Sequence, residues 1–149
     1  MSETLLEGLR SGREEVVNFF ENIEETKLNH RYAENKWTPK EVLMHLMDTE
    51  RIFAYRALRF ARKDDTPVQG FEQDDYIVPS KAHSRTIDSL LHEYKSVREA
   101  TLTLFKYMDE EMLKFVGMAS GSTLSARAAG FIIAGHDRHH IAIIKERYL

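Results

Sequence analysis

Residues 86–108 read TIDSLLHEYKSVREATLTLFKYM and carry the clearest periodicity in the chain. Apolar or small side chains recur there with a period near 3.5, which is typical of a helix that buries one face. The side chains on that face are Ile87, Leu90, Leu91, Tyr94, Val97, Thr101, Leu104, Phe105 and Met108. The pattern predicts an amphipathic helix over residues 86–108 that packs against other helices.

Three further segments have the same character. The helices expected from them span about residues 3–24, 38–62 and 123–148. The second begins at Thr38-Pro39-Lys40-Glu41, where a threonine cap, a first-turn proline and a glutamate form a capping box. On the last helix, the expected core face consists of Ala129, Ile132, Ile133, Ile143 and Ile144. Four helices with one apolar face each predict an all-α four-helix bundle that forms a single domain over residues 1–149.

Composition excludes several classes of protein. The 149 residues include no cysteine, which rules out disulfides, thiolate metal sites and a cysteine nucleophile. Acidic and basic residues are interspersed at a net charge of −3, without the basic stripe of a nucleic-acid binder. No apolar run is long enough to cross a membrane, and the N-terminal MSETLLEGLRSGREE does not have the pattern of a signal peptide. We therefore expect a cytoplasmic protein without nucleic-acid or membrane partners.

Residues 63–83 show no periodicity and contain two of the three prolines. Such a long connection is explained by a crossover between two parallel helices, and it can also act as a lid over a functional site. The aromatic and acidic cluster from Phe71 to Tyr76 makes Tyr76 a candidate pocket residue at the open end of such a site. Arg56, on the preceding helix, is a candidate for binding an anionic substrate or the acids Glu72, Asp74 and Asp75, although a solvated arginine is the default.

Two histidines interrupt the apolar face of the last helix. His136 and His140 are four residues apart, with Ile132 one turn before them and Ile144 one turn after. A buried imidazole without a partner costs about 1–3 kcal/mol, so something must satisfy both rings. A divalent metal can do so, and so can hydrogen bonds to other side chains or water. His139 forms a competing pair with His136, but its neighbours are more polar.

His45 strengthens the metal hypothesis, because it lies at the edge of the apolar face of the second expected helix. Together, His45, His136 and His140 supply three nitrogens and leave positions open for water or substrate, as catalytic metal sites do. Asp48 follows His45 by three residues and is a candidate fourth ligand or outer partner, or else an exposed helix charge. A protease with an HExxH motif is not favoured, because those enzymes take a third ligand from farther down the chain and only nine residues follow His140, and because Asp137 points about 100° away from His136 on a helix.

With these features, the chain resembles the DinB-like superfamily of small bacterial four-helix proteins. The matching stretches are KWTPKEVLMHLMDTER at 36–51, FAYRALRFARKDDTPVQGFEQDDY at 53–76 and GHDRHHIAIIKERYL at 135–149. The resemblance implies an up-down-down-up bundle, with the long connection between the second and third helices. It also implies a divalent metal, nickel or zinc, on His45, His136 and His140.

The same resemblance implies related activities and partners. Members are similar to S-transferases that use a low-molecular-weight thiol such as bacillithiol, mycothiol or glutathione, and others are regarded as metal-dependent hydrolases. Homodimers are common. Three hypotheses therefore stand: a metalloenzyme that activates a thiol or water toward a small-molecule substrate, a non-enzymatic metal-binding or ligand-binding stress protein, and a bundle with structural histidines only.

Overall fold

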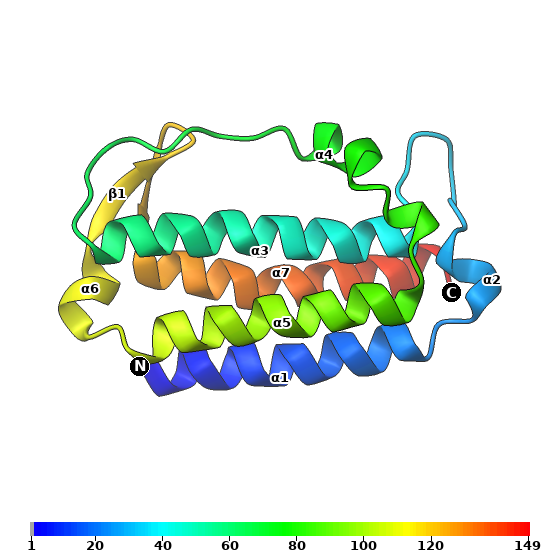
Figure 1. The fold of residues 1–149 in the computed structure, drawn as a ribbon, viewed down its shortest axis with the longest axis horizontal. Coiled ribbons are helices and arrows are strands. Elements are labelled where there is room, and N and C mark those ends of the chain that lie inside the picture. Colours follow the sequence, from blue (N-terminus) through cyan, green and yellow to red (C-terminus); the bar gives the residue numbers. More distant parts are fainter. Residues whose placement is uncertain (1) are drawn as a thin grey trace.

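The computed structural model describes residues 2–149. Four long helices lie along one axis: α1 (Ser2–Glu21), α3 (Pro39–Ala61), α5 (Ile87–Lys106) and α7 (Ala126–Arg147). Helices α1 and α7 run in one direction and α3 and α5 in the other (Figure 1). The all-α four-helix bundle with up-down-down-up topology is thereby confirmed.

Side-chain caps define where the long helices begin. The Thr38 hydroxyl accepts a hydrogen bond from the Glu41 backbone N–H at 3.2 Å, and the Glu41 carboxylate accepts one from the Thr38 N–H at 2.8 Å. This is the predicted capping box, with Pro39 in the first turn of α3. At α5 and α7, the cap is a single hydrogen bond: the Thr86 side chain accepts from the Ser89 N–H, and the Ser125 side chain accepts from the Ala128 N–H. The caps fix the phase of each helix and therefore which side chains face the core.

The start of the last helix differs from the prediction. A hairpin of β1 (Val116–Ala119) and β2 (Ser122–Ser125) precedes α7, so the helix begins three residues later than expected. Ser120 and Gly121 form the two-residue turn with φ of 52° and 76°, the backbone that a type I′ turn requires. Two short helices, α2 (Glu25–Leu28) and α6 (Glu110–Lys114), close the ends of the bundle.

The long connection between α3 and α5 crosses the length of the bundle (Figure 1). The expectation that it lacks regular structure is wrong in part, because it contains α4 (Gln73–Ser80) and the 3₁₀ turn η1 (Ala82–Ser84). Val68 forms a parallel bridge with Ala119 of β1, which ties the connection to the hairpin. Helix α4 was not predicted, because only Ile77 of its eight residues is buried and its sequence therefore lacks the helical periodicity of apolar residues.

The interior of the bundle contains two apolar clusters. One includes Phe20, Leu43 and Tyr94, and the other includes Leu5, Phe60 and Phe105. Between the clusters, Arg98 and Asp137 are buried in a charged layer. No helix within residues 2–149 combines the length and the apolar character needed to span a membrane.

The face that α7 buries differs from the predicted one. Ala129, Ile133 and Ile144 lie in the core as expected, but Ile132 is 41% exposed. The helical period brings Asp137, rather than His136, onto the buried face. His136 and His140 therefore lie at the boundary between α7 and α3, beside the core and half-buried.

Candidate metal centre

Three imidazole rings meet where α3 and α7 pack together. His45 comes from α3, and His136 and His140 lie one turn apart on α7. The His136 Nε2 lies 3.1 Å from the His45 Nε2 and 3.0 Å from the His140 Nε2. Within residues 2–149, no carboxylate joins this group of three possible ligand atoms. The structure thus brings together the three histidines that the sequence singled out.

The geometry of the three rings fits a divalent ion better than it fits hydrogen bonding. A ring nitrogen can donate or accept one hydrogen bond, so the His136 Nε2 cannot satisfy both of its neighbours at once. Two nitrogens that bind one ion at about 2.0–2.1 Å lie about 3 Å apart when the angle at the ion is near 90°. The two observed separations from the His136 Nε2 therefore suit imidazole ligands of one ion, and all three ligand atoms lie within 4.8 Å of one another.

Neighbouring side chains hold the His45 ring in place. The Trp37 ring packs against it at 4.6 Å between centroids, and His45 is only 2% exposed. The Thr49 hydroxyl, one turn along α3, lies 3.3 Å from the His45 Nδ1. In the tautomer whose Nδ1–H donates to the Thr49 hydroxyl, the Nε2 lone pair faces His136, and this is the tautomer that a metal ligand needs.

All three rings are neutral at neutral pH. Burial, together with the charge of His136, lowers the pKa of His45 to about 4. Burial, with the nearby His139, lowers the pKa of His136 to about 4 as well. Burial and the other histidines lower the pKa of His140 to about 3. Neutral imidazole is the form that binds metals, so the site is ready for an ion without losing protons.

A small cavity lies beside His140. Its volume is about 270 Å³, and its walls include Trp37, Tyr148, Gln73 and Asp74. Gln73 and Asp74 belong to α4, so the connection between α3 and α5 lies over this side of the histidine group. This position agrees with a lid, which stays a prediction.

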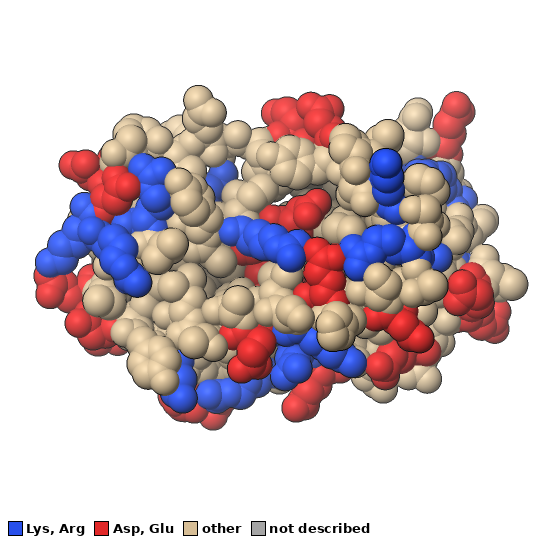
Figure 2. Space-filling view, viewed as in Figure 1, with Lys and Arg blue, Asp and Glu red and all other residues tan. Residues whose placement is uncertain are grey.

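Tyr76 and Asp48 line a different cavity. They lie with Met44 and Arg85 around a space of about 550 Å³ between α4 and α5, and Figure 2 shows the hollow beneath the connection on this face. Burial raises the pKa of Asp48, but its carboxylate is not among the possible ligand atoms. The Tyr76 ring packs edge-on against Phe71 at 5.3 Å between ring centroids, and Tyr76 is 44% exposed. Neither side chain lines the cavity beside His140, and their role at the histidine site stays a prediction.

Arg56 is buried, as a binding residue would be, but its partners are not the ones expected. Its Nη2 donates to the Ser120 hydroxyl at 2.9 Å and to the Gln69 carbonyl at 3.4 Å. Its guanidinium also lies 4.8 Å from the centre of the Phe53 ring. Arg56 forms no bond to Glu72, Asp74 or Asp75. The bridge between Val68 and Ala119 fixes the connection so that the Gln69 carbonyl, rather than one of these acids, faces Arg56. Arg56 thus joins α3, the connection and the hairpin.

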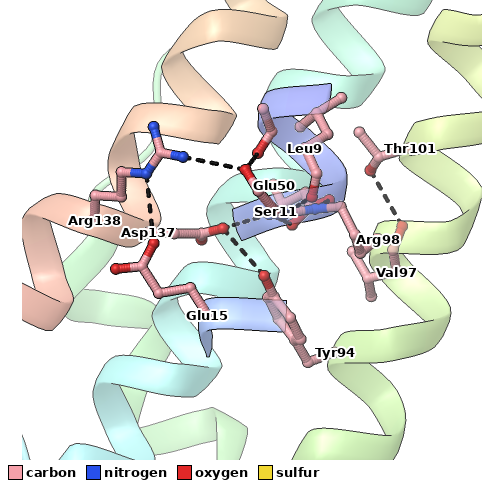
Figure 3. Close-up of polar contacts among 11 residues, drawn as sticks. Leu9, Ser11, Glu15, Glu50, Tyr94, Val97, Arg98, Thr101, Asp137 and Arg138 are labelled. Atoms are coloured by element: carbon pink, nitrogen blue, oxygen red, sulfur yellow. Dashed lines mark hydrogen bonds and ion pairs between the residues drawn. The ribbon is translucent and has the colours of Figure 1, made fainter. Parts of the chain in front are cut away.

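Sequence reasoning missed a buried charged network, hereafter the Arg98 network, formed by Arg98, Glu50, Asp137, Tyr94 and the Leu9 carbonyl (Figure 3). Arg98 donates to both Glu50 oxygens at 2.8 and 2.9 Å and to the Asp137 carboxylate at 2.7 Å. Its Nη1 donates to the Leu9 carbonyl of α1 at 2.9 Å, and the Tyr94 hydroxyl donates to Asp137 at 3.0 Å. One arginine of α5 thus forms hydrogen bonds to the other three long helices.

The network keeps its charges despite burial. Burial alone would lower the pKa of Arg98, but the bonds to Glu50 and the charge of Asp137 raise it above its usual range. Burial raises the pKa of Asp137 to about 6, which leaves this carboxylate ionised at neutral pH. Removing one partner from such a buried group costs about 3–5 kcal/mol, because the remaining charges lose their compensation.

Comparison with known proteins places the chain in a family. The sequence pattern of the DinB superfamily matches residues 9–144. The chain belongs to the DinB superfamily. It is 25% identical over 134 residues to "Putative metal-dependent hydrolase OB0413" from Oceanobacillus iheyensis, a match that spans 88% of this chain and 74% of that protein.

Solved structures share the DinB-superfamily fold. YfiT from Bacillus subtilis, described as a probable metal-dependent hydrolase with an unusual four-helix bundle topology, superposes with a TM-score of 0.86. That likeness covers 97% of this chain and 84% of YfiT at 16% identity. The mycothiol-dependent maleylpyruvate isomerase superposes with a TM-score of 0.78 at 13% identity, over 95% of this chain and 60% of the isomerase. At these identities, the likeness shows the fold alone.

Acid is expected to destabilise the metal-free form of this DinB-superfamily protein. The folded-state pKa values of the three histidines lie below the ordinary value of 6.5. Between about pH 6.5 and pH 4, the unfolded chain therefore binds more protons than the folded chain does. The stability present above pH 6.5 is therefore lost across this range. The raised pKa of Asp137 acts in the opposite direction, but it is one group against three.

Urea unfolding of metal-free protein at a series of pH values measures this effect. The free energy of unfolding should fall on acidification, and the fall should be smaller in His140→Ala, which removes one of the three groups. A free energy that is constant between pH 6.5 and 4 would contradict the prediction.

Proposed function

We propose that this DinB-superfamily protein is a metal-dependent enzyme that holds one divalent ion on His45, His136 and His140 and activates a small thiol for transfer to an electrophilic substrate. The observation that carries the proposal is the convergence of three Nε2 atoms from two helices beside a cavity. Imidazole ligands suit nickel and zinc, which are the metals we propose. The family resemblance adds a homodimer in the cytoplasm to the proposal.

The side chains around the site have separate tasks in this scheme. His45, His136 and His140 hold the ion and leave positions open for a further ligand. Trp37 covers the His45 ring and keeps water from its buried side. The cavity beside His140 admits the small molecule, and Gln73 and Asp74 lie at its rim. A divalent ion supplies the positive charge that lowers the pKa of a coordinated thiol.

Two observations favour a thiol over water as the nucleophile. Within residues 2–149, no carboxylate is among the possible ligand atoms of this group, so a general base for hydrolysis would have to come from the cavity rim, where Asp74 lies. A thiol whose pKa is lowered by a metal needs no such base. The chain has no cysteine, so the thiol must come from a small molecule. The mycothiol-dependent isomerase of similar fold supports the same class of co-substrate.

Hydrolysis is the second candidate, because the relative from Oceanobacillus iheyensis is named "Putative metal-dependent hydrolase OB0413" and YfiT is described as "a probable metal-dependent hydrolase". In that case, water takes the position that we assign to the thiol. The two reactions differ in their products, since only thiol transfer attaches the sulfur to the substrate.

Metal analysis followed by a thiol panel tests the proposal. Natively purified protein should contain about one nickel or zinc ion per chain. It should then accelerate the reaction of 1-chloro-2,4-dinitrobenzene with bacillithiol, mycothiol or glutathione. Turnover of esters or amides without thiol would favour the hydrolase. Bound metal without turnover of either kind would favour a binding protein, and absence of metal would contradict both enzymes.

His45→Ala is expected to remove most of the bound metal. The substitution takes away the one ligand that α3 provides and leaves the i, i+4 pair on α7, which alone binds weakly. His139→Ala and His92→Ala are the matched controls, because both side chains are exposed and should keep about one ion per chain. Metal analysis of the three variants measures the effect. A wild-type metal content in His45→Ala would contradict the assignment of the third ligand.

A further inference from the structure

We propose that Arg98 is a positioning residue for the histidine site: it holds α3 and α7 in the register that brings His45 to His136. The inference rests on the proposed metal site, but it concerns residues that touch neither the ion nor the substrate. Its basis is that Arg98 bonds at once to both of the helices that carry the histidines, through Glu50 on α3 and Asp137 on α7.

The carboxylates that Arg98 binds are close in sequence to the histidines. Asp137 is the residue next to His136, and Glu50 follows His45 by five residues, about one and a half helical turns. A movement of Glu50 or Asp137 along or around its helix axis therefore moves His45 or His136 with it. The three charged side chains are all about 2% exposed or less, so solvent does not replace their bonds.

Directional bonds fix this register better than apolar packing does. Arg98 reaches Glu50 with two parallel N–H groups, and such a fork fixes the carboxylate in both position and orientation. Apolar cores tolerate small rearrangements of side chains, whereas metal sites require ligand distances within about 0.2 Å. Buried ionic groups are often no more stabilising than apolar residues of similar size, so stability alone does not account for the Arg98 network.

A glycine on α1 makes room for the network. At Gly12, an added Cβ would lie 3.3 Å from both the Arg98 Nη1 and the Asp137 Oδ2. At Gly8, one turn earlier on the same helix, it would meet only the Ala134 Cβ, at an ordinary 3.8 Å. The two glycines thus provide a matched pair of sites, of which only Gly12 touches the network.

The experiment compares Gly12→Ala with Gly8→Ala, using Co²⁺ as the metal probe. Alanine favours helix formation over glycine at both sites, so neither variant needs to lose stability. We expect Gly12→Ala to bind Co²⁺ several times more weakly than the wild type and to alter the d–d absorption bands. Gly8→Ala should match the wild type in both measurements. Equal affinities and spectra for the two variants would overturn the proposal.

A second variant keeps the test independent of stability. The combination Glu50→Leu, Tyr94→Phe, Arg98→Met and Asp137→Leu replaces the buried charges, and the hydroxyl that donates to Asp137, by apolar side chains of similar size, which such layers often tolerate without loss of stability. We expect its melting temperature without metal to stay near the wild-type value, while its Co²⁺ affinity falls about tenfold or more, as when other outer-shell partners are removed. Unchanged Co²⁺ affinity would overturn the positioning role.

The outcomes also separate this inference from the proposed function. Wild-type protein that binds no Co²⁺ would overturn both. Wild-type protein that binds Co²⁺ through His45, together with variants of the Arg98 network that bind it equally well, would overturn only the role of Arg98.

Discussion

Arg98→Met is expected to destabilise the protein by about 3–5 kcal/mol, because Glu50 and Asp137 then remain buried as carboxylates without a cation. For a domain near 150 residues, each kcal/mol corresponds to about 2–4 °C, so the melting temperature should fall by about 6–20 °C. The bond from Arg98 to the Leu9 carbonyl of α1 is lost as well.

Thermal unfolding at neutral pH measures this loss. Arg85→Met is the control, because Arg85 binds Glu93 at a partly exposed site where an ion pair contributes only about 0–1 kcal/mol. Adding Glu50→Leu and Asp137→Leu to Arg98→Met should restore most of the stability by removing the stranded charges. A melting temperature for Arg98→Met that equals the Arg85→Met value would show that the network carries little stability.

Chelation is expected to lower the melting temperature of the wild-type protein by about 5–11 °C. An ion that binds only the folded state at a hundredfold excess over its Kd adds about 2.7 kcal/mol, which gives this range for a domain of this size. The protein should remain folded without the ion, because two apolar clusters fill the bundle at either side of the charged layer. A zinc finger, in contrast, loses its fold with its metal.

The same measurement on His136→Ala tells where the ion binds. Because the His136 Nε2 lies next to both other ring nitrogens, its removal should abolish the effect of the chelator. An equal effect on both proteins would place the stabilising ion elsewhere. If the chelator changes neither melting temperature, the three imidazoles are satisfied without a metal.

The start of α3 and the histidine pair could be predicted because both are local patterns. The capping box at Thr38 and the i, i+4 spacing of His136 and His140 involve one helix each, and the structure contains both as expected. That the three histidines hold a metal stays a prediction. The hairpin at residues 116–125 was missed because its Ser-Gly turn is short and its strands are only four residues long.

The Arg98 network was harder to predict, because its members come from different helices. Arg98 follows Tyr94 by four residues and Leu91 by seven, which places it on the apolar face of α5. The same reasoning places Asp137 four residues after Ile133. A charged residue on the buried face of each of three helices, with opposite signs, was the available signal. Which of these charges pair with one another is determined only by how the helices pack together.

The up-down-down-up arrangement has a consequence for how the chain folds. Helix α1 packs on α5 and α7, and α3 packs on the same two, so α1 and α3 lie diagonally opposite each other, as do α5 and α7. Helices joined by the shorter links in sequence therefore form no two-helix hairpin that could collapse first. Apart from the pair α3 and α5, which is joined by the long connection, each main interface unites segments far apart in the chain. Because distant contacts slow folding, this bundle should fold more slowly than one built from successive hairpins.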